Sequence, residues 1–336
     1  MSQYTLELPG LLGNKMLGFM AALGILRTLT RIWPDEDVKL SWKADPIPVP
    51  VLHTNSPKHK DALLEALGEA FEGSHKDWQF NLLIDDPKGP TGKNATEKEK
   101  SEYIREKNAG KFDFETFHKF SQEALTNTAK SEWLTALGSE ISTKPDEAGN
   151  TLLRTMTGGS GQNFIGSLYG LAKHTTEENL EQSIFHPWTY QDGLSKRFYL
   201  KWDPMEDNQG AYKMANDPKG RYEQGANRLA LEAIPLFTAI PTHTKTETVG
   251  FRLKKERGKR LEAYFCWPIW SEPMSLRVIK AITRLPEIVS FTPDYDKLKL
   301  RGVDMIYSAK RCSFNDKNPG SCVFSAGVPV SPAVND

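Results

Sequence analysis

The chain has 336 residues with 43 basic and 43 acidic side chains, so its formal net charge is zero. A neutral chain is not a polyanion-binding arm, and any nucleic-acid binding must come from local patches of charge. Its three cysteines, Cys266, Cys312 and Cys322, are an odd number without a secretory signal, which favours a reducing cytoplasm over a disulfide framework.

The first 150 residues are expected to form an N-terminal α+β part that begins with a strand and a long helix. Tyr4 to Leu8 alternates apolar and polar side chains before a Pro-Gly turn, which is typical of a short strand. Lys15 to Trp33 carries apolar residues at helical spacing. Its uncharged run from Met16 to Leu26 has eleven residues, against the roughly 20 needed to cross a bilayer, so a buried helix and no membrane span is expected.

The rest of this part mixes short elements with one strongly polar segment. The patterns predict a strand at Val38 to Trp42, an extended connector at Pro46 to Pro50, a helix at Lys58 to Phe71, a strand at Gln79 to Ile84 and a helix at Phe112 to Ile141. Residues 88–111 contain almost no large apolar side chain and mix both charges, which predicts a mobile, solvated insertion in the fold.

A second α+β part is expected over residues 151–327, followed by a flexible tail at 328–336. The patterns predict a helix that ends near Lys173, helices at Thr176 to Phe185, Gly225 to Ile234 and Ser275 to Arg284, a strand at Phe198 to Trp202, and a hairpin over 247–267. Helices and strands are irregularly mixed, with no tandem repeat. The sequence therefore predicts an α+β fold with mostly antiparallel strands, forming one large globular unit with a charged insertion.

A glycine-rich turn before the helix that ends near Lys173 is the best candidate for a ligand contact. Gly158, Gly159 and Gly161 leave several backbone N–H groups uncovered at a helix N-terminus, where they favour an anion such as a phosphate. Gln162 and Asn163 follow, so the spacing is neither G-x-G-x-x-G nor G-x-x-x-x-G-K-[ST], and an ATPase site is disfavoured. Alternatively, these glycines only let two elements pack closely.

The turn of the predicted hairpin is the most basic stretch of the chain. Residues 251–261 hold six basic side chains and one acidic one, and five of the basic ones are candidates for contacts to nucleic-acid phosphates: Lys254, Lys255, Arg257, Lys259 and Arg260. The flanking aromatic residues Phe251, Tyr264 and Phe265 are candidates for stacking on bases or, alternatively, for the core. A charged surface loop without a ligand is the other interpretation.

Acidic pairs and histidines give only a weak enzymatic signal. Asp85 and Asp86 follow a predicted strand, and Asp203, Glu206 and Asp207 form a second cluster, but both groups stand beside a proline in turn-like sequence. The seven histidines show no zinc-ligand spacing, and no G-x-S-x-G motif is present. We therefore assign no metal, cofactor or catalytic residue from the sequence.

Several segments resemble CRISPR-associated proteins of the type I-G (formerly I-U) systems. Leu8 to Arg27, with the sequence LPGLLGNKMLGFMAALGILR, is similar to the opening of both the large effector subunit and the family described as an extension of the helicase-nuclease. Asn227 to Phe237 and Trp267 to Trp270 resemble the second of these families. The glycine turn through Gln162 and Asn163 is similar to a glycine-rich element of the large subunit.

The resemblance implies a non-catalytic, nucleic-acid-binding subunit that acts with other CRISPR-associated subunits in the cytoplasm and does not bind a membrane. The basic hairpin and the glycine turn would contact guide RNA or target DNA. Two alternatives stay open. One is a metal-dependent nuclease that uses Asp85, Asp86 or the cluster of Asp203 and Asp207, and the other is a protein-protein scaffold that docks through the Lys15 to Trp33 helix.

Overall fold

The computed structural model describes residues 4–44, 46–76, 114–139, 151–155, 164–190, 198–206, 221–241, 246–255, 261–315 and 318–331. Helices and strands are mixed along these ranges, and every strand pairing recorded there is antiparallel. The predicted α+β class is confirmed. The charged insertion at 88–111, the glycine turn and the strand expected at Gln79 to Ile84 lie outside the described residues.

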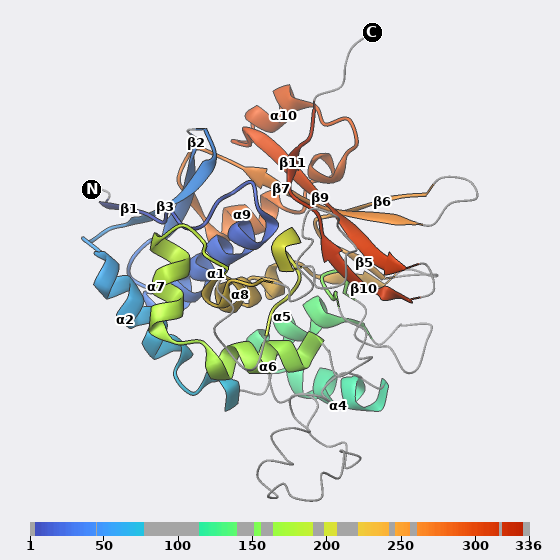
Figure 1. Ribbon diagram of the computed structural model, residues 1–336, viewed down its shortest axis with the longest axis horizontal. Coiled ribbons are helices and arrows are strands. Elements are labelled where there is room, and N and C mark those ends of the chain that lie inside the picture. The colour runs from blue at the N-terminus through green and yellow to red at the C-terminus, as the bar shows by residue number, and fades with distance from the viewer. Residues whose placement is uncertain are drawn as a thin grey trace, which may run out of the picture.

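A long apolar helix, α1 (Met16–Ile32), runs between the two main sheets (Figure 1) and is buried along most of its length. It packs most extensively on α8 (Gln224–Leu231), and also on α2 (Lys60–Phe71) and α9 (Leu276–Ile282). A Cβ atom built at Gly24 would lie 1.8 Å from a backbone carbonyl oxygen of α8. The two helices therefore cross at a distance that only glycine permits at this position.

The first sheet has four strands in the order β1 (Tyr4–Glu7), β3 (Pro48–Thr54), β2 (Lys39–Ala44) and β8 (Met274–Ser275). The expected extended connector over Pro46 to Pro50 is wrong from Pro48 onward, since β3 occupies the interior of this sheet. Proline is tolerated there because the carbonyls of Pro48 and Pro50 bond on the side of β3 away from β2. Their missing N–H groups therefore cost no β2–β3 hydrogen bond.

The second sheet follows the order β10 (Asn318–Phe324), β9 (Met305–Asn315), β7 (Glu262–Ile269) and β6 (Phe251–Lys254), with β11 (Val328–Pro329) also paired to β9. The β6–β7 pairing confirms the predicted hairpin in part. Its outer segment at Thr246–Thr248 is instead β5, which pairs with β4 (Ala239–Pro241). Gly250 lies in the turn between β5 and β6. Its φ of +82° is a conformation that residues with a side chain rarely adopt.

The remaining helices follow the sequence pattern except for α10 (Tyr295–Lys299), where the sequence analysis predicts no helix. The helix expected at Phe112 to Ile141 is interrupted near Asn127, whose side chain caps the second of the two helices that form there. The remaining helices are α4 (Phe114–Ala124), α5 (Thr128–Leu137), α6 (Phe164–His174), α7 (Glu177–Phe185) and α10. Phe198 to Trp202 is not a strand, since the amide of Leu200 bonds to a side chain of α8 instead of a ladder. Within the described ranges, no helix combines the length and apolar character that a bilayer span requires.

Aromatic rings join α1 to both sheets. The ring of Phe19 lies 5.9 Å from that of Trp42 on β2, 6.0 Å from Trp267 on β7 and 6.4 Å from Trp270 just beyond β7. All four side chains are at most 2% exposed. Side chains of both the 1–150 and the 151–327 parts thus share one hydrophobic core.

Substitution of Gly24 by alanine is expected to destabilise the protein by about 1–3 kcal/mol, because the added methyl group forces α1 away from α8. The measurement is urea unfolding monitored by circular dichroism. Gly68→Ala on α2 is the matched control, since its nearest heavy atom would lie 3.7 Å away. The control should be neutral or stabilising by up to about 1 kcal/mol, and equal behaviour of the two variants would contradict the close crossing.

Candidate nucleic-acid interface

Of the predicted nucleic-acid contacts, only the start of the basic turn falls in the described part of the chain. Lys254 ends β6 and Lys255 follows it, and both side chains are exposed. The other candidates lie outside the described residues: Arg257, Lys259, Arg260, Gly158, Gly159, Gly161, Gln162 and Asn163. The structure therefore describes the base of the hairpin, and nucleic-acid contacts by the hairpin and the glycine turn both stay predictions.

The two faces of the second sheet differ sharply in character. Across β6, β7 and β9, Phe251, Phe265 and Ala309 stand in register and are buried. Stacking of bases on Phe251 and Phe265 is therefore ruled out, because side-chain alternation turns both rings into the core. The adjacent register row, Arg252, Tyr264 and Lys310, lies on the opposite face, which we call the outer face.

Arg252 is fixed between two aromatic rings of the outer face. Its guanidinium lies 5.2 Å from the ring centre of Tyr264 and 4.6 Å from that of Phe291. It also donates to the carbonyl of Ser290 at 2.9 Å and to the hydroxyl of Ser308 at 3.2 Å. Phe291 is 49% exposed. The outer face thus presents aromatic surface beside an arginine whose position is set before any ligand arrives.

Tyr264 is also held by an ion pair on its other side. Lys310 Nζ pairs with Glu262, and the hydroxyl of Tyr264 donates to Glu262 Oε2 at 2.6 Å. The hydrogen bond from Lys310 lowers the pKa of Glu262 and raises the pKa of Lys310, while partial burial raises the pKa of Tyr264. At neutral pH the pair is ionised and the tyrosine ring stays uncharged, as stacking on a base requires.

The charge of this region is positive although the chain is neutral. Arg252, Lys254, Lys255 and Lys310 gather at β6 and β9, against the carboxylate of Glu262 on β7. Positive charge next to stacking surface is the combination that binds the backbone and the bases of a single strand. Lys310 and Phe291 come from segments outside the β6–β7 hairpin, so only the tertiary fold brings them to Tyr264 and Arg252.

In one of the two acidic groups that the nuclease alternative could use, Asp203 is bonded to protein groups. Asp203 is fully buried and accepts hydrogen bonds from Lys15 Nζ at 3.2 Å, the Tyr190 hydroxyl at 3.1 Å and the amide of Met205 at 2.9 Å. The Lys15 ammonium also lies 4.9 Å from the ring centre of Trp188. A lysine therefore neutralises Asp203 where a cation would have to bind.

Two further carboxylates extend this buried cluster. Glu206 accepts from the amide of Trp202 at 3.1 Å and from the side chain of Asn227, and Glu223 accepts from Ser183 Oγ at 3.1 Å. Burial raises the pKa of Glu206 to about 8 and also raises the pKa of Glu223. The described residues contain no group of three or more acidic, histidine or cysteine side chains placed to hold a metal ion, while Asp85, Asp86 and Asp207 lie outside them.

The buried cluster has strained backbone as well as satisfied charges. Tyr190 and Lys201 adopt φ of 50° and 56°, a region that residues other than glycine rarely enter. Burial and the nearby Asp203 carboxylate raise the pKa of Tyr190, so it remains a neutral donor. The arrangement ties the loop before α1 to the segments before and after the 198–206 stretch, which is a structural role.

Comparison of the chain with protein-family models, curated proteins and solved structures gave no match. The resemblance to CRISPR-associated proteins therefore rests on the sequence segments that carry it. Two of those segments are neighbours in space, since Leu8 to Arg27 includes most of α1 and Asn227 to Phe237 includes most of α8.

The pKa of Glu206 makes a prediction about stability. A carboxyl with an ordinary pKa of 4.5 that is raised to about 8 by folding favours the folded state only while it is protonated. Stability from this group is therefore complete below about pH 4.5 and falls by about 1.4 kcal/mol per pH unit as the pH rises toward 8. We expect urea unfolding between pH 5 and 8 to show that the stability of Glu206→Gln increases relative to that of wild type as the pH rises.

The comparison uses the change in unfolding free energy with pH. A loss of stability that is the same at every pH, such as that from the hydrogen bonds altered by Glu206→Gln, therefore cancels. Glu69→Gln on the exposed surface of α2 is the control and should keep the pH dependence of wild type. Parallel curves for wild type and Glu206→Gln would show that this carboxyl titrates in the same way in the folded and unfolded chains.

Proposed function

We propose that the protein is a non-catalytic subunit that binds nucleic acid on the outer face of its second sheet. The observation that carries this proposal is the half-buried ring of Tyr264, held between the guanidinium of Arg252 and the ion pair of Lys310. An aromatic ring at the centre of a sheet, flanked by cations, suits an unpaired base and its phosphates. Exposed Lys254 and Lys255 extend this positive surface toward the turn of the hairpin.

The biological setting is CRISPR interference in antiviral defence, with guide RNA or target DNA as the ligand and other CRISPR-associated subunits as partners. This part of the proposal is supported by the resemblance of Leu8 to Arg27 and Asn227 to Phe237 to type I-G proteins. Such a subunit acts in the cytoplasm. The glycine turn with Gln162 and Asn163 would add a contact to a backbone phosphate at its helix N-terminus.

Replacing Tyr264 is the sharpest test of the outer face. Tyr264→Ala should weaken binding of a fluorescent single-stranded RNA or DNA about 5- to 150-fold, as expected for loss of one base–aromatic contact of about 1–3 kcal/mol. Tyr264→Phe keeps the ring and should bind within about threefold of wild type. Tyr4→Ala, which removes an exposed tyrosine from β1 of the other sheet, is the matched control.

A salt series tests the electrostatic part of the proposal. Replacing all five basic residues of the hairpin, Lys254, Lys255, Arg257, Lys259 and Arg260, by alanine should weaken binding of single- and double-stranded probes. It should also reduce the slope of log Kd against log salt. No binding by wild type, or the same affinity and slope in the fivefold variant, would contradict nucleic-acid binding by the isolated subunit.

A further inference from the structure

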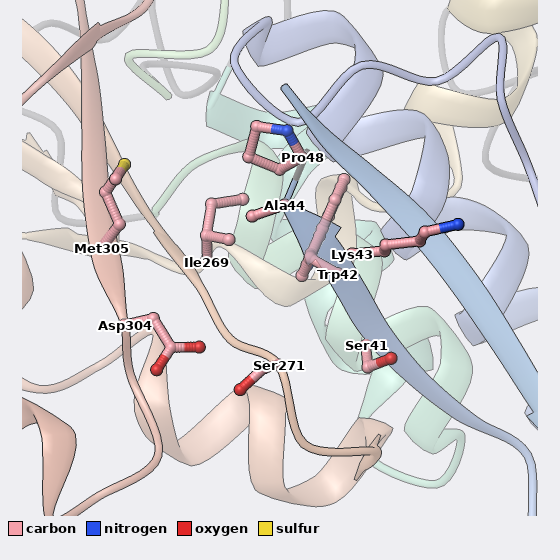
Figure 2. Close-up of a pocket in the computed structure, with 9 residues that line it drawn as sticks. All are labelled: Ser41, Trp42, Lys43, Ala44, Pro48, Ile269, Ser271, Asp304 and Met305. Carbon is pink, nitrogen blue, oxygen red and sulfur yellow. The ribbon is translucent and has the colours of Figure 1, made fainter. Parts of the chain in front are cut away.

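A pocket of about 440 Å³ opens where the edge of the first sheet meets the end of β7 (Figure 2). It is lined by Ser41, Trp42, Lys43, Ala44, Pro48, Ile269, Ser271, Asp304 and Met305. Trp42, Pro48, Ile269 and Met305 give it a continuous apolar wall. Met305 is 37% exposed, so part of this wall is open to solvent.

One end of the pocket carries a negative charge that no ion pair among the described residues compensates. Figure 2 shows the side chains of Asp304 and Ser271 pointing toward each other there, whereas Lys43 points away from the pocket. The Lys43 ammonium pairs with Glu7 of β1 at 2.8 Å. Among the described residues, neither the Asp304 carboxylate nor the Ser271 hydroxyl has a hydrogen-bond or ion-pair partner. The polar end of the pocket therefore favours a cationic guest.

The register of β2 shows that the backbone groups of Trp42 and Ala44, near its end, do not pair with β3. Trp42 lies opposite Pro50, and Ala44 lies opposite Pro48. The carbonyls of both prolines bond on the far side of β3, to amides that follow β1, at 2.9 and 2.7 Å. Directly opposite residues of an antiparallel pair either exchange hydrogen bonds or both point away from each other. The backbone groups of Trp42 and Ala44 therefore point away from β3, toward the pocket.

Of these two residues, only Trp42 forms a hydrogen bond within the described chain on this side. The amide of Trp42 donates to the carbonyl of Trp270 at 2.8 Å, and β8 pairs only with Lys39 and Leu40 further back. In the described part of the chain, the N–H and C=O of Ala44 have no partner on this side. An unpaired strand edge beside an apolar pocket is the geometry by which an extended peptide joins a sheet.

We infer that this pocket docks an extended, basic segment of a partner protein, which pairs with β2 at Ala44. Alternate side chains of an added strand point to the same face, so an apolar side chain packs against the wall of Trp42 and Met305. A lysine or arginine two residues away reaches Asp304 and Ser271. Charge complementarity at Asp304 selects the basic segment over an acidic one. This site does not involve the outer face and does not depend on nucleic-acid binding.

The test is selection of a displayed library of random nine-residue peptides on the full-length protein, followed by titration of a synthetic enriched peptide. We expect enrichment of sequences in which Lys or Arg stands two residues from a large apolar residue. Asp304→Lys should bind such a peptide at least tenfold more weakly and favour Asp or Glu in a new selection. No enriched sequence, or a preference unchanged by Asp304→Lys, would overturn the inference.

Pairing with the strand edge is tested separately by Ala44→Pro. This change removes the outward N–H and leaves the β2–β3 hydrogen bonds intact, so the variant should fold and bind the enriched peptide at least tenfold more weakly. Thr5→Ala, a change at an exposed residue of β1 on the opposite edge of the first sheet, is the control and should bind like wild type. Full binding by a folded Ala44→Pro protein would overturn the inference. So would a concentration-dependent dimer of wild type that Ala44→Pro abolishes, since the occupant would then be a second copy of this chain.

Discussion

The close crossing of α1 and α8 at Gly24 is the constraint on which the rest of the molecule depends. Because no Cβ separates the two backbones there, the apolar face of α1 is fixed relative to the C-terminal half of the chain. The same helix carries Phe19 to the tryptophans of both sheets, and the residue before it, Lys15, reaches Asp203. One helix thus sets the positions of both sheets, and with them the outer face and the pocket beside β2.

Local patterns predicted the helices and the hairpin, because a helix or a two-stranded ribbon is specified by residues close together in sequence. The apolar spacing of Met16 to Ile32 and the basic turn after β6 were sufficient for both. The same logic failed for Pro48 to Pro50, where the prolines suggested a connector. That segment is part of an interior strand because its pairing with β1 and β2 is compatible with the missing amides. The sequence of one strand does not show how that strand will pair with its neighbours.

The candidate sites could be predicted only as far as they are local. Lys254, Lys255 and Tyr264 belong to one hairpin, but Lys310 and Phe291 reach it from other parts of the chain. The buried cluster is further from prediction, since Lys15 lies 175 residues from Tyr190 and 188 from Asp203. The sequence showed Asp203 and Glu206 as acidic residues close together in the chain. Nothing local connects them to Lys15 before α1 or to Asn227 within α8.

The buried cluster also changes what the neutral composition means. A formal charge of zero counts every carboxyl as ionised, yet Glu206 has a pKa of about 8 and is largely protonated at neutral pH. Other carboxylates, such as Asp203 and Glu232, are enclosed in ion pairs with Lys15 and Arg228. Each such pair encloses equal positive and negative charge, so it is the protonation of Glu206 that removes a negative charge included in the sequence count. A polyanion approaching the folded protein meets a more positive field than the unfolded chain would present.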